Sequence, residues 1–213
     1  LYDGSSEILV PDVIIEDFYS DKDVLLPDQK NKLYPNHFLV LKSKDDENKS
    51  AICRYMGKDL PLKQINTYKN IWGLSANNKE QKYAMDLLFD RSVEIVSLTG
   101  QAGTGKTLIA AACGLEQVLS STKSQGGYDK LIITRPVQPM GRDIGFLPGT
   151  LEEKMLPWIA PLRDNLEYLF GDKMALDMQI EQGTIEIEAM TYIRGRSISN
   201  AFMIVDEAQN LTT

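Results

Sequence analysis

The sequence contains few of the residues that build disulfide or metal frameworks, with two cysteines and one histidine in 213 residues. Cys53 and Cys113 are too few for the disulfide framework of a small secreted domain. His37 follows a turn and has no second ligand at the spacing of a metal site. We therefore expect a reduced, cytoplasmic setting.

Long apolar runs and a positive net charge are also absent. No apolar run approaches the roughly 20 residues of a membrane-spanning helix, and no basic segment followed by an apolar core begins the sequence, so we expect no membrane association. A net charge of −7 argues against nucleic-acid binding through bulk charge, which leaves only a local site open. Since the first residue is not Met, the chain is expected to begin inside a longer protein. Its 43% hydrophobic and 25% charged residues are typical of a globular protein.

The strongest pattern present runs from residue 93 to residue 119. It reads as an apolar strand (93–99), a glycine loop and a helix (108–119). The loop satisfies G-x-x-x-x-G-K-[ST], in which backbone N–H groups wrap the phosphates of a nucleoside triphosphate. Lys106 is expected to reach the β- and γ-phosphates, and the Thr107 hydroxyl to ligate Mg²⁺. The residues predicted to bind ATP here are Gly100, Gln101, Ala102, Gly103, Thr104, Gly105, Lys106 and Thr107.

A second half of the site is predicted at Asp206 and Glu207, which end the apolar run 201–205. Asp206 is expected to hold Mg²⁺, and Glu207 to act with Lys106 in catalysis by activating the attacking water. The alternative, a solvated carboxylate pair at a strand end, is disfavoured by the glycine loop upstream. Gln209 is open between a contact to the γ-phosphate and a surface role. No N-K-x-D run supports guanine selection.

The first third of the chain differs from the rest. Between residues 1 and 73, short apolar runs alternate with turn signals and predict a small antiparallel β unit, barrel-like in form. The charged segment 44–49 is expected at a hairpin tip. The predicted strands are 8–10, 13–15, 24–26, 37–42 and 50–56.

From residue 74 to residue 213, strands alternate with helices, which indicates an α/β fold with a parallel sheet and ligand chemistry at the carboxyl ends of its strands. The segment 74–90 is expected to form an amphipathic helix capped by Ser75 or Asn77. The connection 137–161, rich in Pro and Gly, is predicted to be too irregular for one helix. The other strands are predicted at 130–134, 184–189 and 201–205, and the other helices at 163–170 and 173–181.

Several uncommon strings in one order resemble the PhoH family of phosphate-starvation-associated ATPases, over residues 74–213. The resemblance implies a P-loop NTPase sheet similar to the superfamily 1 helicase core. The first third looks like the segment that joins a PIN-type nuclease domain to the ATPase in longer members. Those members continue beyond the position of Thr213, so we expect a fragment that binds ATP but works poorly alone. The strings are Thr134-Arg135-Pro136, the segment 141–149, Glu153-Lys154, Pro157-Trp158, the segment 192–197 and the segment 206–212.

The resemblance also implies roles for four polar side chains, each with an alternative. Gln81 lies where such helicases place an adenine-reading glutamine, or it is an ordinary helix-surface residue. Arg135 lies where helicases contact the nucleic-acid backbone, or it forms an ion pair with an acidic neighbour. Arg194 and Arg196 are open between RNA contacts and arginine fingers to the γ-phosphate of a neighbouring subunit.

We therefore predict an ATPase, the ATP-binding and ATP-hydrolysing module of an RNA-processing, helicase-like protein. Its expected partners are single-stranded RNA, a PIN-type nuclease domain in the longer protein and other copies of the chain. The alternative is a nucleotide-dependent assembly module with little hydrolysis of its own. A small-molecule kinase is disfavoured because Glu207 stands where a water-activating residue belongs.

Overall fold

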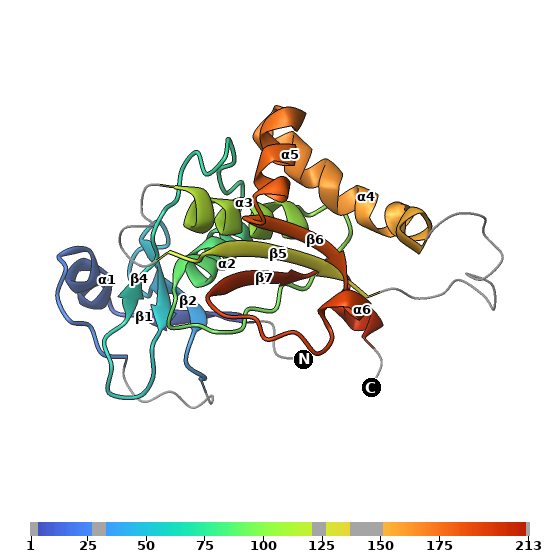
Figure 1. Cartoon of the computed structure of the whole chain (residues 1–213). Coiled ribbons are helices and arrows are strands. Elements are labelled where there is room, and N and C mark those ends of the chain that lie inside the picture. Colours follow the sequence, from blue (N-terminus) through green and yellow to red (C-terminus); the bar gives the residue numbers. More distant parts are fainter. Residues whose placement is uncertain (1–3, 27–32, 121–126, 137–150, 212–213) are drawn as a thin grey trace. The chain divides into compact units, whose positions relative to one another are not determined.

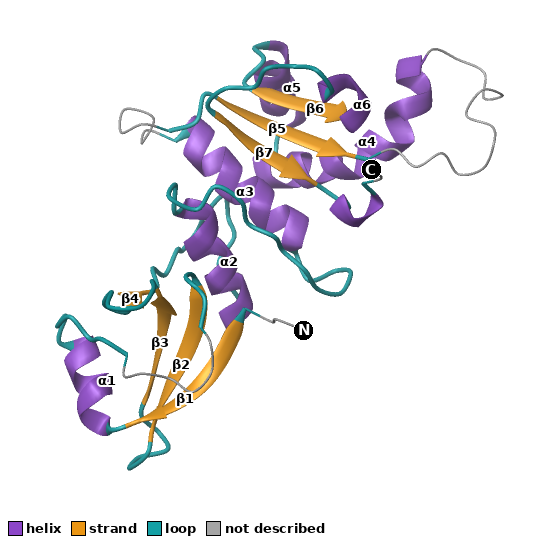
Figure 2. Cartoon of the chain, turned by 90° about the horizontal axis from the view of Figure 1, so that it is seen from below, coloured by secondary structure: helices purple, strands orange, loops and turns teal. Residues whose placement is uncertain are grey.

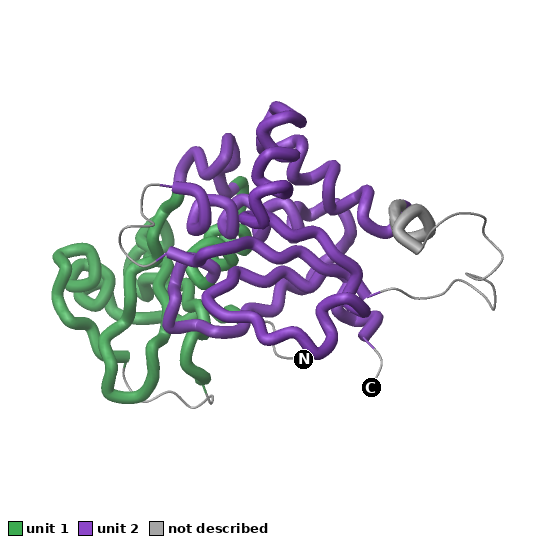
Figure 3. Tube along the Cα trace, in the orientation of Figure 1, with its two compact units in different colours: residues 1–68, 77–87 green, residues 69–76, 88–213 purple. Residues whose placement is uncertain are grey.

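The computed structural model describes residues 4–26, 33–120, 127–136 and 151–211, with the side chains of 151–156 left aside. The elements form two compact units, unit 1 (residues 1–68 and 77–87) and unit 2 (69–76 and 88–213) (Figure 3). The helices are α1 (Asp12–Tyr19), α2 (Lys79–Phe89), α3 (Lys106–Leu119), α4 (Leu151–Phe170), α5 (Lys173–Glu181), α6 (Met190–Ile193) and the 3₁₀ turn η3 (Ala208–Asn210). The strands are β1 (Ser5–Val10), β2 (His37–Ser43), β3 (Ser50–Tyr55), β4 (Lys63–Gln64), β5 (Lys130–Arg135), β6 (Ile185–Ala189) and β7 (Ala201–Val205).

Unit 1 is built on a sheet in the order β1-β2-β3-β4. The predicted strands at 37–42 and 50–56 are confirmed as β2 and β3, which pair antiparallel across the charged segment 44–49. The purely antiparallel sheet is wrong, because β1 runs parallel to β2. The strand predicted at 13–15 is also wrong. These residues lie in α1, where Ile15 and Phe18 are three positions apart and bury on one helix face.

Helix α2 belongs to unit 1 up to Leu87, although its position in the sequence predicted it as part of the ATPase region. Asp86 pairs with Arg54 of β3 at 2.9 Å, and Tyr83 stacks on Phe38 of β2 at a centroid distance of 4.2 Å. The two units therefore interleave along the chain between residues 69 and 88, in place of the single boundary drawn between 73 and 74. The predicted caps of this helix are wrong, since Asn78 Oδ1 accepts from the Gln81 N–H.

Unit 2 contains the predicted parallel sheet, in the order β6-β5-β7 (Figure 2). β5 is paired on both sides, and Leu131, Ile132 and Ile133 are fully buried. Helices α3, α4 and α5 lie on one face of this sheet (Figure 1). The predicted strands 130–134, 184–189 and 201–205 and the helix 173–181 are confirmed.

The strand predicted at 93–99 is not present. These residues form no regular element and pair with no strand among the described residues, and Ile95 is 88% exposed. An apolar run becomes a strand only where another strand offers its unpaired N–H and C=O groups. β6 and β7 each pair only with β5 among the described strands, and residues 93–99 pair with neither of their outer edges.

Helix α4 begins ten residues before the predicted end of the irregular connection; the earlier part of that connection, 137–150, lies outside the described residues. Pro157 and Pro161 lie inside the helix and are exposed. Leu162 and Leu166 are buried, so an apolar stripe packed on the sheet maintains the helix despite the lost N–H groups. Within the described ranges, no helix is long and apolar enough to cross a lipid bilayer.

Candidate nucleotide-binding site

The glycine loop ends at the N-terminus of α3, as the sequence predicts. Gly103 and Gly105 have φ values of 78° and 83°, a left-handed conformation that glycine adopts without a steric penalty. Lys106 begins α3 directly after Gly105. The loop amides therefore lie at the positive end of a helix of 14 residues, which favours a bound anion.

A glycine inside α3 places that helix close to the sheet. A Cβ atom on Gly114 would lie 2.8 Å from Leu131 Cδ1 and 2.9 Å from Phe202 Cδ1. Only glycine therefore allows this approach without a shift of β5 or β7 side chains. The sequence signal for this contact is a glycine within an alanine-rich helix.

The two predicted magnesium ligands lie together. Thr107 Oγ1 donates to Asp206 Oδ1 at 2.8 Å, across 99 positions of sequence. The Asp206 N–H donates to the Thr134 carbonyl of β5 at 2.8 Å, which fixes the backbone just beyond β7. A hydroxyl and a carboxylate suit Mg²⁺, which binds few protein oxygens and keeps several waters or phosphate oxygens. The described residues contain no cluster of three or more His, Cys, Asp or Glu side chains that could hold a metal alone.

Lys106 folds back on its own loop. Its Nζ donates to the carbonyls of Gly100 at 2.9 Å and Gln101 at 2.7 Å. Thr104 Oγ1 also donates to the Gln101 carbonyl, at 2.9 Å. Because an ammonium bonds more strongly to a phosphate oxygen than to a neutral carbonyl, a bound phosphate can displace these contacts.

Glu207 is held by two side-chain contacts. Its Oε1 lies 3.5 Å from Arg135 Nη2, and its Oε2 accepts from Gln209 Nε2. Its backbone is left-handed, with φ 51° and ψ 39°, which is costly for a residue with a Cβ atom. Of the alternatives for Arg135, the structure therefore contains the ion pair, with Glu207 as a partner that no sequence pattern indicated. Gln209 contacts Glu207 in addition to being exposed.

Arg196 and Arg194 differ in their surroundings. Arg196 donates to Glu188 at 2.7 Å and to Glu186 at 2.8 Å, and the Glu186 bond raises the pKa of Arg196. Burial acts to raise the pKa of Glu186, but bonds from Lys130 and Arg196 together lower it. Arg194 is exposed and makes no hydrogen bond or ion pair with any residue that the structure describes. Arg196 thus bonds two glutamates of β6, while the exposed Arg194 guanidinium can bind a ligand.

Gln81 lies in unit 1, near the start of α2. Its N–H donates to Asn78 Oδ1 at 2.8 Å, and its Oε1 accepts from the Asn77 N–H at 2.7 Å. This pattern resembles a capping box, except that Gln81 accepts from the residue before the N-cap, and it gives the side chain a structural role. Its adenine-reading role stays a prediction.

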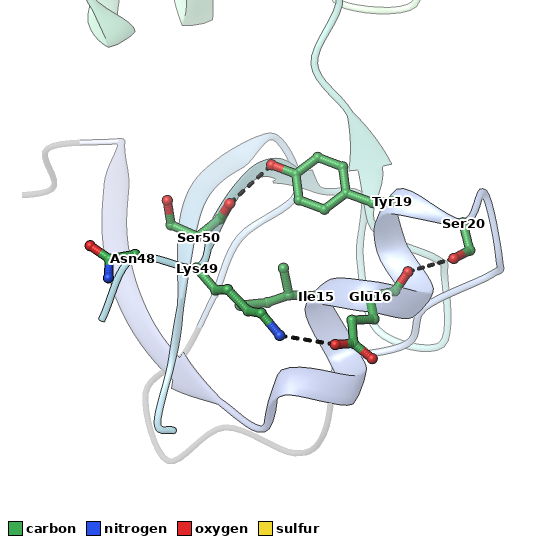
Figure 4. Close-up of a pocket in the computed structure, with 7 residues that line it drawn as sticks. All are labelled: Ile15, Glu16, Tyr19, Ser20, Asn48, Lys49 and Ser50. Carbon is green, nitrogen blue, oxygen red and sulfur yellow. Dashed lines mark hydrogen bonds and ion pairs between the residues drawn. The ribbon is translucent and has the colours of Figure 1, made fainter. Parts of the chain in front are cut away.

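A shallow hollow in unit 1 lies between α1 and the start of β3 (Figure 4). Its polar groups bond to one another: Lys49 Nζ to Glu16 Oε1 at 3.0 Å, Tyr19 Oη to the Ser50 carbonyl at 2.9 Å, and Ser20 Oγ to the Glu16 carbonyl at 2.7 Å. These contacts account for the polar side chains of the hollow by structure alone. The glycine loop of unit 2 is the stronger candidate site.

Comparison with known proteins shows which family the chain resembles. A sequence profile of the PhoH-like protein family matches residues 73–213. Protein PhoH2 of Bacillus subtilis (strain 168) is 41% identical over 217 aligned residues, which cover 100% of the chain and 48% of that protein. Protein PhoH2 of Mycolicibacterium smegmatis is 44% identical over 144 residues, 67% of the chain and 32% of that protein. Protein PhoH of Escherichia coli (strain K12) is 38% identical over 138 residues, 64% of the chain and 37% of that protein. The chain therefore spans about half the length of the Bacillus relative and about a third of the length of the other two proteins.

Proposed function

Because the chain belongs to the PhoH family of nucleotide-binding, ATPase-like proteins, we propose that it binds Mg²⁺-ATP in unit 2 and hydrolyses it in response to single-stranded RNA. The observation that carries the proposal is the 2.8 Å hydrogen bond between Thr107 and Asp206. It joins the helix that follows the glycine loop to the strand end that carries the two carboxylates. Residues distant in sequence thereby form one oxygen-rich site beside a phosphate-binding loop.

Each residue of the candidate site has a defined role in this proposal. The loop amides and Lys106 bind the β- and γ-phosphates, and Lys106 exchanges its two loop carbonyls for phosphate oxygens. Thr107 and Asp206 would hold the metal, whose charge offsets the charge that develops on the phosphates. Glu207 orients and deprotonates the attacking water, a contribution of roughly 10²- to 10⁴-fold in rate.

The test is phosphate release from Mg²⁺-ATP, with and without single-stranded RNA, using Lys106→Ala as the blank. Glu207→Gln is expected to retain nucleotide binding and to lower turnover by at least about 10²-fold. The two carboxylates then differ, because Asp206→Asn weakens binding of the metal-nucleotide complex itself. Equal loss of binding and turnover in Glu207→Gln contradicts the role given to this residue.

The RNA arm of the same assay separates the motor proposal from its alternative. Turnover that rises with RNA supports an RNA-coupled ATPase, similar to the superfamily 1 helicases. A chain that instead changes mass with ATP in light scattering, without RNA-dependent turnover, supports the nucleotide-dependent assembly module. Association with other copies of the chain and with a PIN-type nuclease domain stay predictions in either case.

A further inference from the structure

The ion pair between Arg135 and Glu207 is unusually loose for unit 2. Its atoms are 3.5 Å apart, whereas Arg196 bonds its two glutamates at 2.7 and 2.8 Å. The Arg135 side chain is 26% exposed and the Glu207 side chain 39%. A guanidinium carries five N–H donors, and Arg135 makes no side-chain hydrogen bond within the described part of the chain. An anion that binds the guanidinium more strongly can therefore displace the Glu207 carboxylate from Arg135.

A second guanidinium lies at the same edge of the sheet. β5 and β6 are parallel neighbours, and Arg135 is in register with Ala189, the last residue of β6. Arg194 follows directly after α6, which continues from that strand end, and it has no partner among the described residues. A partly exposed guanidinium at the end of β5 and an exposed one just after α6 suit a polyanion, whose successive phosphates can engage both.

We propose that Arg135 is a positioning residue that holds Glu207 until a phosphodiester of single-stranded RNA takes the place of that carboxylate. A phosphate accepts two parallel N–H bonds from a guanidinium, which exceeds the single 3.5 Å contact to Glu207. Exchange of Arg135 onto the phosphate releases Glu207 Oε1, which can then accept a proton from water, while Oε2 keeps its bond from Gln209. The inference rests on the proposed function for the role of Glu207, and it explains why RNA would raise turnover.

The exchange predicts a competition that can be measured without hydrolysis. RNA and Glu207 share one guanidinium, so removing the Glu207 charge must strengthen RNA binding, and must do so only where Arg135 is present. A partly exposed ion pair of this kind corresponds to about a two- to fivefold change in affinity.

The experiment is a double-mutant cycle on RNA affinity, read by fluorescence anisotropy of a labelled single-stranded oligouridine in the absence of nucleotide. Glu207→Gln is expected to tighten binding about two- to fivefold. Arg135→Gln is expected to weaken binding and to reduce the slope of log affinity against log salt by about 0.7, the value for one phosphate contact to a single strand. The double variant is expected to bind like Arg135→Gln alone.

Three matched variants separate exchange from general charge effects. Lys130→Gln removes a cation of similar exposure from the opposite, amino end of β5, and is expected to leave the salt slope unchanged. Glu188→Gln removes a carboxylate at the carboxyl edge, and is expected to change RNA affinity alike with Arg or Gln at position 135. Arg135→Lys keeps the charge, and is expected to restore the salt slope.

Additive effects of Glu207→Gln and Arg135→Gln overturn the proposal, as does a chain that fails to bind the RNA probe. A third overturning outcome is that Glu207→Gln changes affinity for an ATP analogue in an Arg135-dependent way while RNA affinity stays constant. That result assigns Arg135 to the γ-phosphate of the nucleotide. None of these outcomes depends on phosphate release, so failure of the exchange is distinguishable from failure of the ATPase proposal.

Discussion

The buried ion pair between Arg54 and Asp86 predicts that α2 and the sheet of unit 1 lose stability together. Arg54 Nη1 lies 2.9 Å from Asp86 Oδ2, and the two side chains are 0% and 1% exposed. Asp86 Oδ1 accepts from the Asn66 N–H at 3.1 Å, and Arg54 Nε donates to Asn36 at 3.0 Å. Arg54→Met keeps the length of the side chain and removes its charge, which leaves the Asp86 carboxylate buried opposite an apolar group.

Removing one partner of a fully buried pair destabilises a protein by about 3–5 kcal/mol. In a unit of this size, each kcal/mol lowers Tm by about 4–8 °C, so the loss amounts to more than about 12 °C. The effect should be largely reversed in Arg54→Met/Asp86→Leu, because replacing both charges by apolar groups is often neutral or stabilising. Asn66 is exposed, so water can accept the N–H that this second change leaves without Asp86.

Hydrogen exchange can follow the two units separately. Amides of α2 are expected to lose protection together with those of β2 and β3, because α2 is anchored to them through Asp86 and Tyr83. Tryptophan fluorescence reports unfolding of unit 2, since Trp72 and Trp158 both lie there. The denaturation midpoint of unit 2 is expected to change less than that of unit 1. If α2 amides keep their protection in Arg54→Met while β3 amides lose theirs, α2 is not stabilised by unit 1 and the reasoning is wrong.

Three further predictions concern packing. Gly114→Ala should lower the free energy of unfolding by about 1 kcal/mol in urea titrations. Overpacking against Leu131 and Phe202 costs about 1–3 kcal/mol, and the gain in helix propensity offsets about 1 kcal/mol of that. An unchanged urea midpoint would show that the Leu131 and Phe202 side chains move aside without cost. Thr134→Val should raise stability by about 1 kcal/mol, since the buried Thr134 hydroxyl has no hydrogen-bond partner among the described residues. Burial raises the pKa of the Cys53 and Cys113 thiols to about 12, so their contribution to stability is complete below the ordinary value of 9.0 and is lost as pH rises from there toward 12. Cys53→Ala/Cys113→Ala should therefore flatten the fall in stability over that alkaline range, and an equally steep fall would contradict the assignment.

Local patterns predicted the elements that need only an apolar surface to pack against, whatever residues form that surface. β7 is a run of five apolar residues, and β5 has the buried apolar run Leu131-Ile132-Ile133 at its centre, a pattern that predicts buried strands. The glycine loop was predictable for a different reason, because positive φ at Gly103 and Gly105 and the helix start at Lys106 follow from those residue types. Asp206 was found by its place at the end of a strand, and its contact with Thr107 follows from the α/β architecture.

The errors fall where a distant partner decides the outcome. Residues 93–99 are as apolar as β5, but no described strand pairs with them. Residues 13–15 are as apolar as β1, but Phe18 adds a buried position at helical spacing. Helix α2 contacts unit 1 through partners distant in sequence, among them Arg54, which lies 32 positions before Asp86. No local periodicity carries that information.

The pairing of Arg135 with Glu207 was out of reach of the sequence for a topological reason. Three strands met in the chain order β5, β6, β7 are arranged in space as β6-β5-β7. If β7 had added beyond β6, its end would lie two strand spacings from β5, about 10 Å, and the two side chains would face different neighbours. In the observed order Thr134 is in register with Val205, so Arg135 and Asp206 follow on neighbouring strands at the carboxyl edge, and Glu207 is one residue further on. The contact that we infer to couple RNA to the water-activating carboxylate is therefore produced by strand order, with the residue types supplying only its chemistry.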